Sequence, residues 1–183
     1  MSLLNIHLLG SPVLRERSKE VGAVDDRVRA FVADMIETMR ACKGVGLAAN
    51  QVGVATRVCV VEAEPGQVHA LIDPVIVEHS GNEKDEEGCL SIPDIYADVA
   101  RATSVTVEAT DEHGVRRRIS GEGLLARAIQ HEIDHLDGIL FLDRIGPIKR
   151  RFLMRDWEKQ RKGKSGFIRE VTPEPADEDA ATR

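Results

Sequence analysis

The residues with the clearest chemical potential are the H-E-x-x-H run at His131, Glu132 and His135. Residues four apart share one face of a helix, so both imidazoles can bind one metal ion with Glu132 beside the open coordination position. A metal held in this way lowers the pKa of its bound water to about 7, and the carboxylate can move the protons. The alternative interpretation is two surface histidines on an ordinary helix.

The identity of a third ligand separates the possible kinds of metal site. A metzincin would need a third histidine at position 141, which is Phe141. A zincin would need a downstream carboxylate such as Glu158, but that residue lies in a basic stretch and is better explained as a partner of Lys or Arg. Cys89 remains, because a thiolate with two imidazoles suits a divalent transition metal. Taken alone, a cysteine is more often a buried structural residue, which is how we interpret Cys42 and Cys59.

Two long segments with apolar residues at helical spacing predict helices over residues 25–44 and 121–137. Asp25 or Asp26 can cap the start of the first, and Gly138 can close the end of the second. A third, weaker helix is expected after Pro147. The two histidines therefore lie on the second predicted helix.

Short segments rich in β-branched residues predict strands, and around Cys89 we expect only a short strand or a bend. The predicted strands are residues 57–63, 68–72, 75–78, 103–110, 115–120 and 139–142. Helices interleaved irregularly with antiparallel hairpins indicate an α+β fold. We expect antiparallel strands packed around the central H-E-x-x-H helix, with an N-terminal and a C-terminal helix.

Three blocks of sequence, taken together, carry a family resemblance. They are residues 44–51 (GVGLAANQ), residues 87–91 (EGCLS) and residues 130–136 (QHEIDHL). In this order and at these separations they resemble the bacterial type of peptide deformylase, the metallohydrolase that removes the formyl group from the initiator methionine of new polypeptides. With residues 10–15 (GSPVLR), the resemblance covers about residues 5–150.

The resemblance implies a role for each matching residue. Cys89, His131 and His135 would bind one divalent metal ion, and Glu132 would act as general base and acid. The oxyanion would be stabilised by the Gln51 side-chain amide and the Leu90 backbone N–H. Backbone groups that bind an extended peptide are implied at Gly44, Val45, Gly46 and Gly88.

The resemblance also implies a cofactor and partners. Fe(II) is the usual physiological metal of the family, with Zn, Ni or Co found according to preparation. The substrates would be N-formylmethionyl nascent peptides. Residues 149–169 carry nine basic and two acidic residues, so we predict that this segment contacts ribosomal RNA; a solvated helix is the alternative.

Two other functions fit parts of the pattern. An H-E-x-x-H zinc endopeptidase would use Glu158 or another distant ligand in place of Cys89. A structural zinc module in a binding protein would need a fourth protein ligand, and the remaining cysteines lie in apolar core patterns. Formate release from a formylated peptide, compared with cleavage of an unformylated one, distinguishes these functions.

Two charged side chains near the blocks carry further predictions. Glu87 and Arg101 are predicted to form an ion pair that holds the Cys89 segment against the helix, the alternative being two exposed charges. Arg127 lies four residues before His131, so its stem is predicted to line the rim of the methionine pocket while its charge reaches solvent. A plain surface arginine is the alternative.

The composition limits the class of protein. A chain of 183 residues with 42% hydrophobic and 31% charged residues fits one globular domain without a membrane span. A net charge of -6 and 3% aromatic residues argue against global nucleic-acid binding. Three cysteines and no basic leader favour a cytoplasmic protein. We expect a single domain over residues 1–168 that includes the basic helix, and a disordered acidic tail over residues 169–183.

Overall fold

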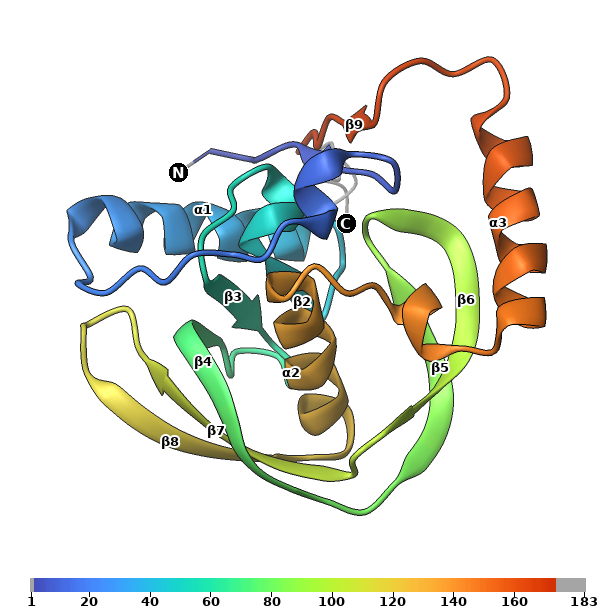
Figure 1. Ribbon diagram of the computed structural model, residues 1–183. Coiled ribbons are helices and arrows are strands. Elements are labelled where there is room, and N and C mark those ends of the chain that lie inside the picture. Colours follow the sequence, from blue (N-terminus) through green and yellow to red (C-terminus); the bar gives the residue numbers. More distant parts are fainter. Residues whose placement is uncertain (1, 174–183) are drawn as a thin grey trace, which may run out of the picture.

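Helix α2 (Gly123–Leu136) lies at the centre of the fold with strands on either side of it (Figure 1). The computed structural model describes residues 2–173. The other helices are α1 (Asp26–Ala41) and α3 (Pro147–Arg161), with the 3-10 helices η1 (Pro12–Arg15), η2 (Ala49–Val52) and η3 (Phe141–Arg144). The strands are β1 (Ile6–His7), β2 (Gly46–Ala48), β3 (Val58–Val61), β4 (His69–Ser80), β5 (Glu83–Cys89), β6 (Ile92–Arg101), β7 (Ser104–Thr110), β8 (Arg116–Glu122) and β9 (Ile168–Arg169).

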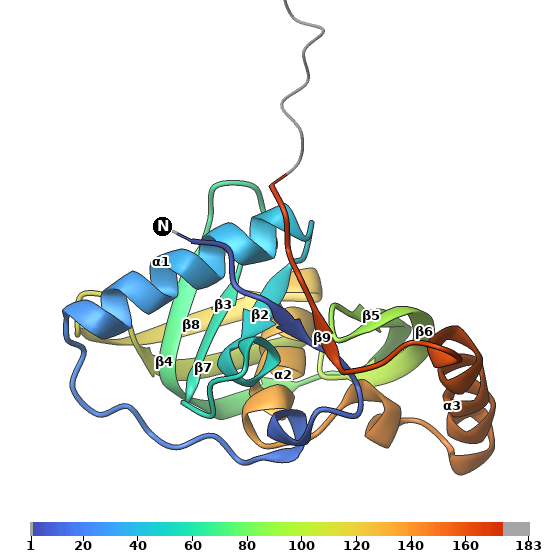
Figure 2. The ribbon, with the colours of Figure 1, turned by 90° about the horizontal axis from the view of Figure 1, so that it is seen from above.

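The strands form three antiparallel groups. Five of them make one sheet in the order β2-β3-β4-β7-β8, and β5 and β6 form a separate hairpin. β1 and β9 pair with each other, although they come from opposite ends of the chain. Figure 2 shows α1 along one side of this arrangement and α3 at its far end. Helices packed on antiparallel strands confirm the predicted α+β fold.

The apolar face of α2 holds the helix against the five-stranded sheet. Ile129 and Leu136 are fully buried in a cluster that includes Leu71 of β4 and Val107 of β7. Each side chain of this size contributes about 1.5–3 kcal/mol when it is fully buried. The opposite face of α2 is therefore left to carry the polar residues of the H-E-x-x-H run.

The ends of the helices agree with the prediction only in part, since α1 ends at Ala41 rather than at residue 44. The Asp25 side chain caps α1 by accepting a hydrogen bond from a first-turn N–H at 2.9 Å. The second helix begins later than the predicted residue 121, because β8 continues as far as Glu122. It is followed by Gly138 at φ +74°, where a Cβ would lie 2.6 Å from the Arg15 carbonyl oxygen. Glycine is thus required at this turn both by its backbone conformation and by close packing.

Two strand predictions are wrong. Residues 68–72 and 75–78 belong to one strand, β4, whose register shifts around Asp73 at φ +50°. Residues 139–142 form no strand, and a 3-10 helix begins at Phe141. Leu140, Phe141 and Leu142 of that run are buried without strand pairing, so their apolar pattern reflected burial alone.

The β5–β6 hairpin is more extensive than the predicted short strand or bend around Cys89. The first half of β5 is exposed and acidic, which resembles a solvated loop in sequence. Along β6, however, buried and exposed residues alternate, with Ile95, Ala97, Val99 and Arg101 all facing inward. This alternation is the usual signal of a half-buried strand, and it was overlooked.

The third helix predicted after Pro147 is present and ends at Arg161. Beyond it, Arg169 pairs with Ile6, so strand pairing extends past the predicted domain boundary at residue 168. The rest of the predicted acidic tail, from residue 174 on, lies outside the described residues. Within residues 2–173, every helix is too short or too polar to cross a membrane.

Candidate metal centre

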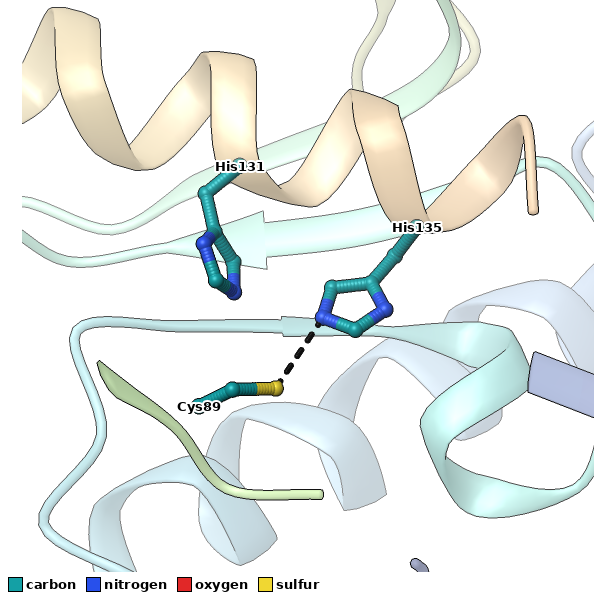
Figure 3. Close-up of side chains that lie close together, drawn as sticks. All are labelled: Cys89, His131 and His135. Atoms are coloured by element: carbon teal, nitrogen blue, oxygen red, sulfur yellow. Dashed lines mark hydrogen bonds between the residues drawn. The ribbon is translucent and has the colours of Figure 1, made fainter. Parts of the chain in front are cut away.

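The three predicted ligands come together in the structure. One ligand atom from each of Cys89, His131 and His135 lies within 4.8 Å of the other two. Cys89 Sγ is 3.2 Å from His135 Nε2, and Figure 3 shows both imidazoles projecting from α2 toward the thiol. A thiolate and two imidazoles, with no fourth protein ligand among the described residues, fit a catalytic rather than a structural transition-metal site.

Backbone geometry explains this convergence. His131 and His135 are one helical turn apart on α2, so their rings share a face, with centroids 4.9 Å apart. Cys89 ends β5 at a register shift in the hairpin, between the pairs Glu87↔Ala97 and Cys89↔Ile92. The irregularity turns the thiol toward the helix.

Glu87 orients one of the candidate ligands and neutralises a neighbouring cation. Its Oε2 lies 3.0 Å from His131 Nδ1, which leaves the Nε2 of that ring to face the cluster. Arg101 donates to both oxygens of Glu87, at 2.8 and 3.0 Å, and both side chains are only 4% exposed. The predicted Glu87–Arg101 ion pair is confirmed. Burial alone would raise the pKa of Glu87, but the bonds from His131 and Arg101 outweigh it and lower the pKa to about 2.

Arg127 behaves differently from the prediction. Its guanidinium does not reach solvent: the residue is 9% exposed, and Nη1 donates to Glu87 Oε1 at 2.9 Å and to the Val99 carbonyl at 2.8 Å. Nη2 donates to the Glu83 carbonyl at 2.9 Å. Backbone carbonyls of the hairpin take the place of water around the Arg127 guanidinium. No local sequence pattern around Arg127 indicates these contacts.

Asp134 belongs to the same buried network and was missed. It accepts from Arg101 at 2.5 Å and from Arg144 at 2.5 and 2.9 Å. Together these bonds tie the ligand helix to the hairpin and to η3. The sequence signal that could have identified Asp134 was its position between the two histidines, on a helix that had to be partly buried.

The η2 turn holds both ligand-bearing elements. Gln51 Nε2 donates to Ser91 Oγ at 3.1 Å and contacts Cys89 Sγ at 3.5 Å, while its Oε1 accepts from the Ala48 N–H at 2.9 Å. The neighbouring Asn50 amide donates to the backbone carbonyl of His135. Asn50 and Ser91 were not singled out from the sequence, because their partners are distant along the chain.

Glu132 lies beside the cluster without a partner for one oxygen. Its side chain is almost fully buried, and within the described residues Oε2 accepts no hydrogen bond. Burial raises the pKa of Glu132 to about 7. At Gly46 a Cβ would lie 2.8 Å from the Glu132 Cδ, so only glycine leaves room for this carboxylate. A buried carboxylate oxygen with no protein partner fits a site completed by a metal ion and its water.

A cavity of about 490 Å³ opens onto the cluster. Every predicted site residue except His135 lines it, including Gly44, Val45 and Gly88 of the two walls and Leu90 of the hairpin turn. His135 is buried and does not line the cavity. The cavity therefore joins the candidate metal ligands and the candidate peptide-binding backbone in one space.

Residues 3–151 match the family profile described as polypeptide deformylase. The chain belongs to this family. Among its relatives, a peptide deformylase of Dictyoglomus thermophilum is 48% identical over 139 residues, which are 76% of this chain and 90% of the relative. A peptide deformylase of Brucella suis is 43% identical over 87% of this chain and 94% of its own length.

Solved deformylase structures share the fold. The Legionella pneumophila peptide deformylase has a TM-score of 0.84 and 40% identity, covering 88% of this chain and 96% of the other. The Ehrlichia chaffeensis peptide deformylase in complex with actinonin has a TM-score of 0.85 and 38% identity, covering 90% and 100%. As a deformylase, the chain is a metal-dependent hydrolase that removes N-formyl groups from polypeptides, and the endopeptidase alternative is not supported.

A change at Glu87 tests how strongly the buried network supports the metal site. We expect Glu87→Gln to weaken metal binding by roughly 10–100-fold, because the amide cannot balance Arg101 or orient His131 in the same way. The metal affinities of the variant and the unchanged protein are compared by competition with a chelator.

Glu86→Gln is the matched control for this change, since Glu86 is the exposed neighbour on the same strand. It should bind metal as the unchanged protein does. Equal affinities for the Glu87 and Glu86 variants would show that the network is only structural.

Proposed function

We propose that this deformylase acts on N-formylmethionyl nascent peptides with Cys89, His131 and His135 as its metal ligands. The observation that carries the assignment is the cluster of these three side chains beside the unpartnered carboxylate oxygen of Glu132. A divalent metal ion held by these three side chains would supply a Lewis acid for the formyl carbonyl and would lower the pKa of water.

Glu132 moves the protons of the reaction. Its carboxylate takes one proton from the attacking water and delivers it to the methionine nitrogen as the bond between carbonyl carbon and nitrogen breaks. The carboxyl group of the released formic acid gives up the second proton of the water to the new amine, so the products are formate and a protonated amino terminus. A positioned general base or acid of this kind contributes about 10²–10⁴-fold in rate.

Gln51 and Leu90 stabilise the negative charge that develops on the carbonyl oxygen. The bond from the Ala48 N–H to Gln51 Oε1 fixes the orientation of the amide, so that its Nε2 faces the Cys89 side of the cavity. Leu90 follows Cys89 directly and lines the same cavity, and its backbone N–H is the second proposed donor. Each preorganised donor of this type contributes about 10²–10³-fold.

The substrate chain binds as an additional strand. β2 is the edge strand of the five-stranded sheet, and Gly44, Val45 and Gly46 line the cavity along its unpaired side. Gly88 lines the facing wall. An extended peptide between the two walls pairs with backbone groups, which gives affinity with little dependence on side chains.

The test of this function compares two peptides. A formyl-methionyl peptide should release formate, and the same peptide without the formyl group should not be cleaved. Cleavage of the unformylated peptide with no formate release from the other would indicate an endopeptidase instead.

We propose Fe(II) as the physiological metal, in agreement with the usual metal of the family. The mixed thiolate and imidazole ligands suit iron, zinc, nickel and cobalt alike. Iron bound through the Cys89 thiolate is open to oxidation, so the iron form should lose activity in air while a nickel form keeps it. Equal stability of the two forms in air would contradict this expectation.

We also propose a cytoplasmic enzyme whose helix α3 contacts ribosomal RNA, since formylated chains emerge at the ribosome. The helix carries exposed basic residues at Arg151, Arg155 and Lys159, spaced one turn apart. Neutralising all three with glutamine should reduce co-sedimentation with ribosomes at low salt, because phosphate contacts depend on charge. Substitution is preferable to truncation, because Trp157 of α3 is buried in the core.

The control for the α3 variant is an equal change of charge elsewhere. Glutamine at Arg17, Lys19 and Arg27, which are exposed near the start of the chain, should leave sedimentation unchanged. Equal sedimentation of both triple variants, or none by the unchanged protein, would make α3 a solvated helix only.

A further inference from the structure

Strand β9 brings Arg169 to the cavity that contains the metal cluster. The chain returns after α3 to lie beside β1, where Arg169 pairs with Ile6 (Figures 1 and 2). This pairing places the Arg169 side chain on the cavity wall near Cys42 and Lys43. Arg169 lies beyond residue 151, where the match to the family profile ends.

Most N–H donors of the Arg169 guanidinium make no hydrogen bond with a described residue. It is half-buried, and its one hydrogen bond with a described residue runs from Nη2 to Cys42 Sγ at 3.5 Å. Sulfur is a weak acceptor, whereas a guanidinium offers five N–H groups in a fork that matches a carboxylate. No carboxylate of residues 2–173 lies within 4.0 Å of it. A half-buried arginine without an anionic partner among residues 2–173 is suited to bind an anionic group of a ligand.

The position of Arg169 along the cavity indicates which part of a peptide it meets. The wall formed by residues 42–46 starts at Cys42, beside Arg169, and ends at Gly46, beside Glu132. An extended chain rises about 3.3 Å per residue. With the formyl group at Glu132 and the methionine level with Gly46, the third residue lies opposite Gly44, near the Arg169 end.

The charges of the two walls differ in sign at this end. Arg169 lies on the side of β2, whereas Glu86 and Asp94 lie on the side of the hairpin. A carboxylate on the third residue is attracted to the first side and repelled by the second. A basic side chain would be drawn to the hairpin instead.

We propose that Arg169 forms a binding subsite for a carboxylate at the third residue of the formyl peptide. The carboxylate is either an acidic side chain of a longer chain or the free carboxyl end of a tripeptide. This inference rests on the proposed function, because it assumes that the formyl group lies at Glu132.

The experiment compares matched peptides by their kcat and KM. For the side chain, formyl-Met-Ala-Glu-Ala amide is compared with the same peptide carrying Gln. For the chain end, formyl-Met-Ala-Ala is compared as free acid and as amide. A charged hydrogen bond at a half-exposed site should favour the carboxylate by about threefold to tenfold, mainly through KM.

Variants of Arg169 then test whether this residue causes the preference for a carboxylate. Arg169→Gln should remove the preference by raising KM for the carboxylate peptides to the value for their uncharged counterparts, and Arg169→Lys should keep part of it. Arg151→Gln, an equal change of charge on α3, should keep all of it. A preference confined to the free acid would assign the subsite to chain ends, and one confined to Glu would assign it to side chains.

The outcomes separate the two proposals. Equal kinetics for all peptides, a preference for the uncharged peptides, or a preference that survives in Arg169→Gln would overturn the subsite while deformylation itself stands. Absence of formate release from every peptide would overturn the proposed function, and the subsite with it.

Discussion

Glu132→Gln is expected to remove nearly all deformylase activity while the metal stays bound. Glutamine fills the same space, but its amide cannot take a proton from water or return one to the leaving nitrogen. We expect kcat to fall by about 10²–10⁴-fold. The protein should still fold, because an uncharged amide suits a buried position where a charge is already disfavoured. The measurements are formate release and metal content by elemental analysis on the same sample.

Glu122→Gln is the control for this variant. Glu122 is exposed just before α2 and makes no capping bond through its side chain. The same change there should leave both formate release and metal content unaltered. Near-normal kcat in Glu132→Gln would assign the proton transfers to another group. Loss of metal together with activity would instead make Glu132 a support for the ligands.

The helices of this protein could be predicted because their signals are local. Apolar spacing and the cap at Asp25 defined α1, and spacing with Gly138 defined α2. The β5–β6 hairpin was underestimated because half of β5 is exposed and acidic, and exposed strands differ little from loops in sequence. For residues 139–142, burial alone produced an apolar run that resembles a strand.

The candidate ligands also differ in whether a local sequence signal predicts them. Helical spacing places His131 and His135 together without any further information, whereas Cys89 had to be brought in from a hairpin 42 residues before His131 (131 − 89 = 42). Its assignment depended on the resemblance of three blocks rather than on spacing.

The supporting contacts of the site depend on the tertiary fold. Arg127 and Asp134 lie on the predicted helix, yet their partners are hairpin carbonyls, Glu87 and two arginines that only the fold brings near. Arg169 gives no local signal at all, because its place at the cavity follows from the pairing of β9 with β1.

Cys89→Ala is expected to lose the metal ion. Removing the thiolate leaves two imidazoles, and we expect affinity to fall by more than the roughly 10–100-fold that loss of a supporting contact costs. Metal content should drop from about one ion per chain to a small fraction after dialysis, because binding of the ion depends on deprotonated ligands. Elemental analysis and metal competition with a chelator provide the measurement.

The stability of the fold gives an independent check on the same assignment. A metal that binds only the folded state raises the midpoint of thermal unfolding, so a chelator should lower that midpoint in the unchanged protein and leave it unaltered in Cys89→Ala. Cys42→Ala is the matched control: Cys42 lines the same cavity but lies outside the ligand cluster, so its metal content and its response to the chelator should be those of the unchanged protein. Full metal content in Cys89→Ala, or equal losses in both variants, would contradict the assignment of Cys89, since a ligand must matter more than another thiol in the same cavity.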